Sequence, residues 1–133
     1  MLVENPGVPG YTRSQVVLQS ADYKGDQAVT LTNLANRALH VILDVTAKTS
    51  TPTSITLSIK GIDPASGKKY SLLDGEAVTG VATKVYKVFP SAVAELNAVA
   101  NDMLPPLVEI SVVGVGVTDT KYFTFSVGAN WGT

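Results

Sequence analysis

The stretch LHVILDVTAKT, beginning at Leu39, most constrains what this chain can fold into. Over ten residues, one set of apolar side chains alternates with another set that is mainly polar. The first set is Leu39, Val41, Leu43, Val45 and Ala47; the second is His40, Ile42, Asp44, Thr46 and Lys48. A period of two is typical of a β-strand with one face on a core. The stretch therefore predicts a half-buried strand.

Seven further segments show strand signals between turn residues. They are TRSQVVLQS, AVTLTN, SITLSIK, KKYSLL, TKVYKVF, LVEISVVGVGV and KYFTFSVGANW. Many short strands at close spacing are typical of a β-sandwich or barrel. We predict an all-β, eight-stranded β-sandwich, jelly-roll-like, with two packed four-stranded sheets. A seven-stranded immunoglobulin-like sandwich is the alternative, although the chain lacks the cysteines and central tryptophan of that fold.

One segment carries a helical pattern instead. In SAVAELNAVANDM, apolar residues recur at spacings of three and four, at Val93, Leu96, Ala100 and Met103. Ser91 could cap the first turn, and the prolines after Leu104 would end the helix. We expect at most one short helix, near residues 91–103.

Length and composition narrow the class of protein. A chain of 133 residues is expected to form one domain. Charged residues make up 16% of it, below the roughly 25% of typical domains, which favours a surface partly covered by partners. The net charge is −1 and the cations are scattered, so we expect no nucleic-acid partner. The apolar stretches are too short or interrupted to span a bilayer, so we expect no membrane partner.

The first ten residues differ from the rest. Prolines and glycines in MLVENPGVPG oppose regular strand pairing, although several side chains are apolar. We predict an extended N-terminal arm over residues 1–10, which orders against a partner or a neighbouring subunit, and a single β-sandwich domain over residues 11–133.

The sequence contains no evident catalytic or metal-binding group. The single histidine, His40, shares a predicted strand face with Asp44, but four residues of strand separate them by roughly 13 Å. No cysteine is present, no cluster has metal-ligand spacing, and no feature selects two carboxylates as a pair. We therefore predict no enzymatic activity, no cofactor and no metal.

Candidate partner-binding residues come from the arm, one loop and the C-terminal tail. In GIDPASGKKYSLLDG, the proline, glycine and aspartate each have a turn role, so a β-hairpin with an exposed contact loop is expected. The tryptophan near the C-terminus suggests a tail held against its own domain or a neighbour. The predicted residues are Leu2, Val3, Pro6, Val8, Pro9, Tyr11, Asp63, Lys68, Lys69 and Trp131.

Four segments together resemble a family of small virion proteins of tailed bacteriophages. They are SITLSIKGIDPASGKKYSLL, VYKVFP, ANDMLPP and YFTFSVGANW, and ANRALHVILDVTAKT adds to the likeness. The family shows D-P-x-S-G-K, A-N-D-x-L-P and Y-S-V-G-A elements, and the resemblance covers roughly residues 35–129. Two departures occur: Leu107-Val108-Glu109 replaces a Trp-Arg pair often found after the Leu-Pro, and Phe125 replaces a tyrosine.

The resemblance implies a capsid decoration (cement) protein of a bacteriophage head. Such a protein would be a homotrimer on the outer surface of the virion capsid. It would bridge major capsid protein subunits and stabilise the shell, after synthesis in the host bacterial cytoplasm. A phage tail or fibre-attachment role and a virion-displayed carbohydrate-binding module remain alternatives. Glycan binding has no specific support in the sequence.

Overall fold

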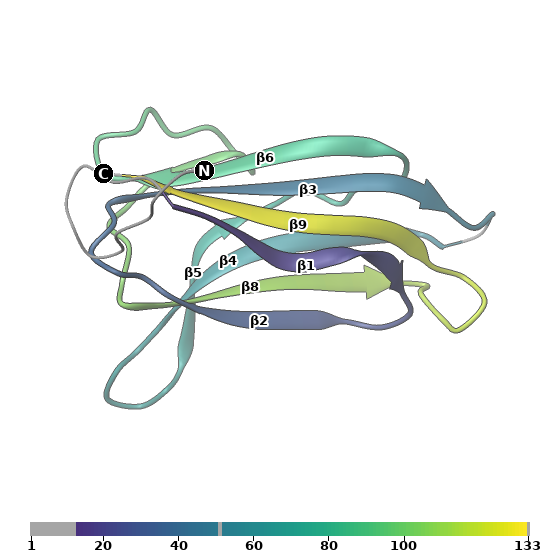
Figure 1. The fold of residues 1–133 in the computed structure, drawn as a ribbon, viewed down its shortest axis with the longest axis horizontal. Helices are drawn as coiled ribbons and strands as arrows, with labels where there is room; N and C mark the ends of the chain where they lie inside the picture. Colours follow the sequence, from purple (N-terminus) through teal and green to yellow (C-terminus); the bar gives the residue numbers. More distant parts are fainter. Residues whose placement is uncertain (1–12, 51, 133) are drawn as a thin grey trace.

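A computed structural model describes residues 13–50 and 52–132 of the chain. Within these residues the fold is all-β, with nine strands and no helix (Figure 1). The strands are β1 (Arg13–Tyr23), β2 (Gln27–Thr32), β3 (Ala38–Lys48), β4 (Ser54–Ile62), β5 (Lys69–Asp74), β6 (Ala82–Phe89), β7 (Val99–Asn101), β8 (Leu107–Val115) and β9 (Phe123–Gly132). None of these residues forms a helix that could cross a membrane.

The strands form two sheets that pack as a sandwich (Figure 1). The five-stranded sheet has the order β1-β9-β3-β6-β7, and the four-stranded sheet has the order β2-β8-β4-β5. Without the three-residue strand β7, two four-stranded sheets remain, and their strand order is that of a jelly roll. The predicted all-β sandwich is confirmed, with nine strands rather than eight. β7, which pairs in parallel with β6, is the strand that the sequence did not predict.

The core lies between the two sheets and follows the period of two. In β3 the side chains from Leu39 to Val45 alternate between buried and partly buried, as predicted. β9 lies beside β3 and sends five side chains inward, each at most 2% exposed: Phe123, Phe125, Val127, Ala129 and Trp131. Because β9 also pairs with β1, its inward face is at the centre of the core.

The helix predicted near residues 91–103 is wrong. This segment forms turns, an isolated bridge between Glu95 and Val99, and strand β7. The apolar residues with helical spacing are not a core face, because Leu96 is 92% exposed and Met103 is 69% exposed. The backbone also leaves the helical region at two positions, because Ser91 has φ 69° and Asn97 has φ 62°.

The loops gather at the two ends of the sandwich. One end contains the loops of residues 33–37, 63–68, 90–98 and 102–106, together with the start of β1 and the end of β9. The opposite end contains residues 49–50 and 52–53 and the loops of residues 24–26, 75–81 and 116–122. Binding residues on loops are therefore presented in two separate groups.

Gly75 lies in close contact with Leu57 of one sheet and Tyr86 of the other. Its amide donates to the carbonyl of Leu57, and a Cβ there would lie 2.7 Å from that oxygen and 2.8 Å from the Tyr86 ring. We expect Gly75→Ala to lower the free energy of unfolding by about 1–3 kcal/mol, because a buried contact must shift. Gly80→Ala is the control, since a Cβ at Gly80 meets nothing within 4 Å. Urea unfolding of both variants measures the difference, and equal losses would contradict the predicted contact.

Candidate partner-binding surface

The loop between β4 and β5 is a hydrogen-bonded turn that extends beyond the sandwich (Figure 1). The Asp63 carboxylate accepts from the amide of Ala65 at 3.0 Å and from the hydroxyl of Ser66 at 2.7 Å. Gly67 closes the turn at φ 75° and donates its amide to the carbonyl of Asp63. The amide of Ala65, with the Ser66 hydroxyl second, holds the pKa of Asp63 below its ordinary value. Asp63 therefore stabilises the turn, as its sequence position predicts.

Lys69 holds the base of this hairpin against the neighbouring strand β8. Its Nζ lies 2.6 Å from Oε2 of Glu109, whose side chain is only 7% exposed, whereas that of Lys69 is 50% exposed. A buried carboxylate needs such a partner, because burying an unpaired charge is costly. The two lysines of the loop thus differ: Lys68 is exposed at the tip, and Lys69 forms an ion pair within the domain.

Trp131 belongs to the core of its own domain. It is 1% exposed, its Nε1 donates to Oε1 of Gln15 at 2.7 Å, and the Arg13 guanidinium lies 5.1 Å from the ring centroid. The sequence left open whether the C-terminal tail is held against its own domain or against a neighbour. The structure shows that Trp131 packs within its own domain. The indole presents almost no surface to a partner, so the tryptophan can affect binding only by fixing the end of β9.

The predicted N-terminal arm of residues 1–10 lies outside the described residues. The candidate residues Leu2, Val3, Pro6, Val8, Pro9 and Tyr11 lie outside the described residues. The first described residue of β1, Arg13, is at the loop end that contains the β4–β5 hairpin, because it pairs with Trp131 and donates to the carbonyl of Thr32.

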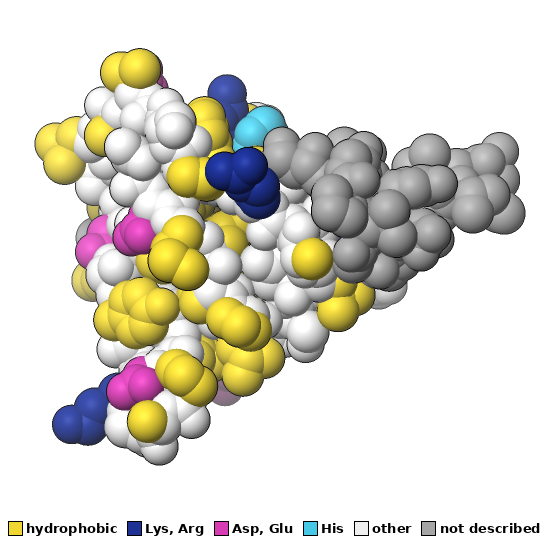
Figure 2. All heavy atoms as spheres, turned by 90° about the vertical axis from the view of Figure 1, so that its left-hand side faces the viewer, with side chains coloured by type: hydrophobic (Ala, Val, Ile, Leu, Met, Phe, Trp, Pro, Cys, Tyr) yellow, Lys and Arg dark blue, Asp and Glu magenta, His cyan; other side chains and the backbone are white. Residues whose placement is uncertain are grey.

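This loop end carries most of the exposed large hydrophobic side chains of the described chain. Six of the eleven such residues lie here, which we call the apolar end: Leu34, Tyr70, Val93, Leu96, Met103 and Leu107. Figure 2 views the molecule from this side and shows hydrophobic side chains spread over it, with isolated charged groups among them. Exposed apolar side chains concentrated on one surface are typical of a protein-binding site.

Hydrogen bonds hold two loops of the apolar end in fixed positions. The Asn33 side chain caps its own loop, accepting from the amide of Asn36 and donating to its carbonyl. The amide of Asn33 donates to the carbonyl of Pro106 at 2.8 Å, which joins this loop to the segment after β7. Leu104, 8% exposed, fixes that segment to the core. Leu34 and Met103 are thus presented on supported backbone.

The loop of residues 90–98 is fixed in the same manner. The Asn97 side chain donates to the carbonyl of Asp74 at 2.8 Å, and the amide of Ser91 donates to Oδ1 of Asn101 at 2.9 Å. Between these two ties the side chains of Val93 and Leu96 are 86% and 92% exposed. Two aliphatic side chains are therefore exposed to solvent on a loop that hydrogen bonds tie to the domain at both ends.

Backbone strain is concentrated at the same end. Three non-glycine residues among those described have positive φ, namely Ala35 (62°), Ser91 (69°) and Asn97 (62°), and all three lie in these loops. Each costs of order 1–3 kcal/mol, and such residues cluster at functional sites, where the surroundings hold them. The apolar end is therefore maintained at the expense of stability.

The described residues include one histidine and one exposed aromatic side chain. They contain no group of three or more histidine, aspartate or glutamate side chains that could hold a metal ion. Asp44 accepts a hydrogen bond from Thr83 at 2.9 Å. Desolvation, with Lys87 second, lowers the pKa of His40 below its ordinary value. Tyr70 is the only exposed aromatic side chain in the described part of the chain, so these residues provide no aromatic platform.

Sequence reasoning missed the aliphatic side chains of this end. Val93, Leu96 and Met103 have helical spacing, and that pattern predicts a helix rather than exposed loops. The proline boundaries, Pro90 and Pro105-Pro106, do not reveal the exposure, because residues 91–104 leave room for a helix of nearly four turns.

Comparisons with known proteins gave weak matches to solved structures and no match by sequence. No protein-family model and no curated protein matches the sequence. Two solved structures of infectious bursal disease virus are similar to the chain. The Gx strain structure has a TM-score of 0.40 and 13% identity, and the Gt strain structure has a TM-score of 0.36 and 15% identity. The matches cover 92% and 90% of this chain, which spans about a third of the length of each matched chain.

Removing the amine beside Glu109 should destabilise the domain. We expect Lys69→Met to lower the free energy of unfolding by about 1–3 kcal/mol, because it leaves a buried carboxylate unpaired. Adding Glu109→Gln should recover part of that loss, since the remaining group is then neutral. Lys68→Met, in the same loop, is the control and should change stability little. Guanidinium unfolding measures all four proteins, and a Lys69→Met variant as stable as Lys68→Met would contradict the pairing.

Acid should weaken the turn at Asp63. Because hydrogen bonds lower its folded-state pKa, the contribution of Asp63 is present above the unfolded value of about 3.9 and is lost as pH falls through the folded pKa. We expect Asp63→Asn to be less stable at neutral pH, with the difference narrowing as the solution becomes acidic. Thermal unfolding of both proteins from neutral to strongly acidic pH measures this. A difference that stays constant with pH would contradict the role of the carboxylate.

Proposed function

We propose that the chain is a bacteriophage capsid decoration (cement) protein. It binds the outer surface of the assembled head, bridges major capsid protein subunits and stabilises the shell. In this proposal the chain is not an enzyme, and its location is the outer surface of the virion after synthesis in the host bacterial cytoplasm. The family resemblance over roughly residues 35–129 suggests this role, and the apolar end supports it.

The observation that carries the proposal is the pair of exposed aliphatic side chains on the loop of residues 90–98. Val93 and Leu96 are 86% and 92% exposed, and hydrogen bonds from Asn97 and to Ser91 hold their loop. Rigid apolar groups lose little conformational entropy on binding, so they suit contact with a protein surface. The exposed tip of the β4–β5 hairpin, with Lys68, lies at the same end and gives a second contact region.

The proposed mechanism is mass action. A protein that binds the assembled shell and not its separate subunits stabilises the assembled state. Many copies along shared subunit edges give avidity without a single strong site. Low charge suits this role, because contacts that rely on apolar area are less sensitive to salt than those that rely on ion pairs. In this proposal the N-terminal arm adds contacts, and three copies come together as a unit only on the shell, so the free chain need not be a trimer.

Head binding by surface variants tests the proposal. We expect Val93→Asp and Leu96→Asp each to weaken binding to heads by at least about tenfold, because a lost central apolar contact costs 2 kcal/mol or more. The measurement is co-sedimentation with purified heads that lack this protein, taken from the phage that encodes it. Val81→Asp is the matched control, since Val81 is 67% exposed at the opposite end. Binding that falls equally in all three variants, or in none, would contradict the proposed surface.

A further inference from the structure

The outer face of the five-stranded sheet carries an apolar stripe across four strands. The register places Val16 of β1 beside Gly128 of β9, Gly128 beside Ile42 of β3, and Ile42 beside Val85 of β6. These four residues share one face, because cross-strand partners point to the same side of a sheet. Val16 is 66% exposed and Val85 is 44% exposed, so the apolar groups are open to solvent.

A polar row flanks the stripe on each side. On the side toward the apolar end, the register aligns Ser14, Asn130, His40 and Lys87. On the other side it aligns Ser126, Asp44 and Thr83. Lys87 and Asp44 are the formal charges of these two rows at neutral pH, so one row is basic and the other is acidic. Successive rows are about 6.6 Å apart along the strands.

We propose that this face binds a second copy of the chain about a two-fold axis that runs along the stripe. About such an axis, each strand of one copy lies over the same strand of the other copy, and the two strands run in opposite directions. The basic row of each copy then faces the acidic row of the other. Asp44 of the partner lies over His40 and beside Lys87, and Ser126 of the partner lies over Asn130. The face is therefore complementary to itself in charge, which an isologous contact requires.

The alternative two-fold axis, parallel to the strands, is disfavoured by the same charges. With the axis between β9 and β3, Lys87 of one copy would lie over Ser14 of the other, and the two Asp44 side chains would lie beside each other. Like charges across an interface cost free energy and suppress that arrangement. The charge pattern therefore favours one of the two orientations in which the faces could pack.

The available area suits a specific complex. β3 has 11 residues and β9 has 10, so the four strands from β1 to β6 provide a face of roughly 36 Å by 19 Å. This footprint is about 700 Å² on each copy, close to the roughly 800 Å² that each partner buries in a stable interface.

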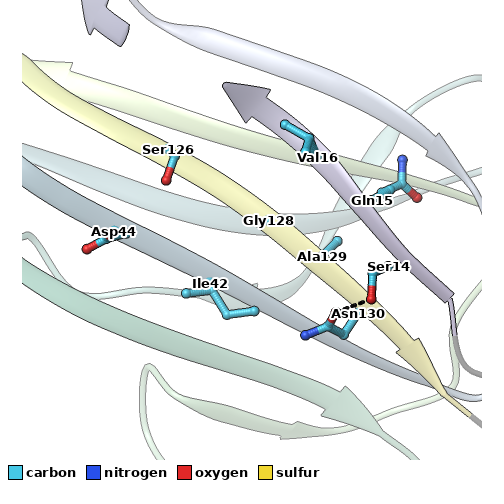
Figure 3. Close-up of a pocket in the computed structure, with 9 residues that line it drawn as sticks. All are labelled: Ser14, Gln15, Val16, Ile42, Asp44, Ser126, Gly128, Ala129 and Asn130. Atoms are coloured by element: carbon cyan, nitrogen blue, oxygen red, sulfur yellow. Dashed lines mark hydrogen bonds between the residues drawn. The ribbon is translucent and has the colours of Figure 1, made fainter. Parts of the chain in front are cut away.

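The hollow in the face has a defined place in this dimer. A shallow trough of about 560 Å³ lies over Gly128, between Val16 and Ile42, and Figure 3 shows the side chains that line it. About the proposed axis the troughs of two copies face each other. Hydroxyl, amide and carboxylate groups of Ser126, Asn130 and Asp44 line the trough, so the enclosed space can hold ordered water. The interface is thus apolar at Val16 and Val85 and wet near its centre.

Charge reversal with rescue tests this proposal directly. We expect the full chain to have twice the monomer mass in sedimentation equilibrium. Asp44→Lys or Lys87→Glu alone should raise the dimer dissociation constant by about a hundredfold, because each reversal creates two symmetric like-charge contacts. The double variant Asp44→Lys/Lys87→Glu restores opposite charges and should restore the dimer. Lys121→Glu, exposed at the opposite end, is the charge-matched control and should leave the dimer unchanged.

A second pair of variants tests the stripe. Val16→Asp should dissociate the dimer, whereas Val81→Asp, at 67% exposure against 66%, should not. Circular dichroism and thermal unfolding establish that every variant folds. A chain that is monomeric at every concentration would overturn the proposal. A dimer or trimer that is indifferent to both single reversals would also overturn it.

Discussion

The inward face of β9 is the constraint on which the rest of the structure depends. Five of its side chains, at most 2% exposed, pack between the sheets, and the strand pairs with both β1 and β3. Because side chains alternate, burying this set fixes the outward set as well, which includes Ser126, Gly128 and Asn130. A slip of one residue would bury those polar groups. The core therefore fixes the position of the apolar stripe and of the polar rows beside it.

The same core leaves the loops of the apolar end free to present apolar side chains to solvent. Leu104 and Ala92 are buried apolar side chains of these loops, and hydrogen bonds of the Asn33 and Asn97 side chains maintain the shape of the loops. A surface of this kind costs free energy in the isolated chain, through strained backbone and exposed apolar area. Association with a protein partner would recover part of that cost.

The sequence predicted the elements that local pattern determines. Alternation identified β3 and β4, and the Asp-Pro-x-Ser-Gly segment identified the turn at Asp63. Prediction from the sequence failed where the structure depends on contacts between residues far apart in the chain. Helical spacing at Val93 and Leu96 predicted a helix, but the chain turns at Ser91 and Asn97, where φ is positive, and both side chains are exposed. The ion pair of Lys69 joins residues forty positions apart in sequence, so only strand pairing brings them together.

The stripe on the outer face shows the same limit. Val16, Gly128, Ile42 and Val85 come from four strands that are far apart in sequence, and no local period connects them. Their alignment can be recognised only from the register of three strand pairs, which the sequence does not provide. The two proposed surfaces, the apolar end and this outer face, lie on different sides of the domain. Shell binding and self-association can therefore occur in one copy.

Cross-linking of intact virions with an amine-reactive reagent tests the central claim most directly. Lys68 is exposed at the tip of the β4–β5 hairpin, at the apolar end, and Lys121 is exposed at the opposite end. If the apolar end contacts the shell, mass spectrometry should find cross-links from Lys68 to the major capsid protein and few from Lys121. Cross-links to the shell mainly from Lys121, or cross-links only to tail proteins, would contradict the account.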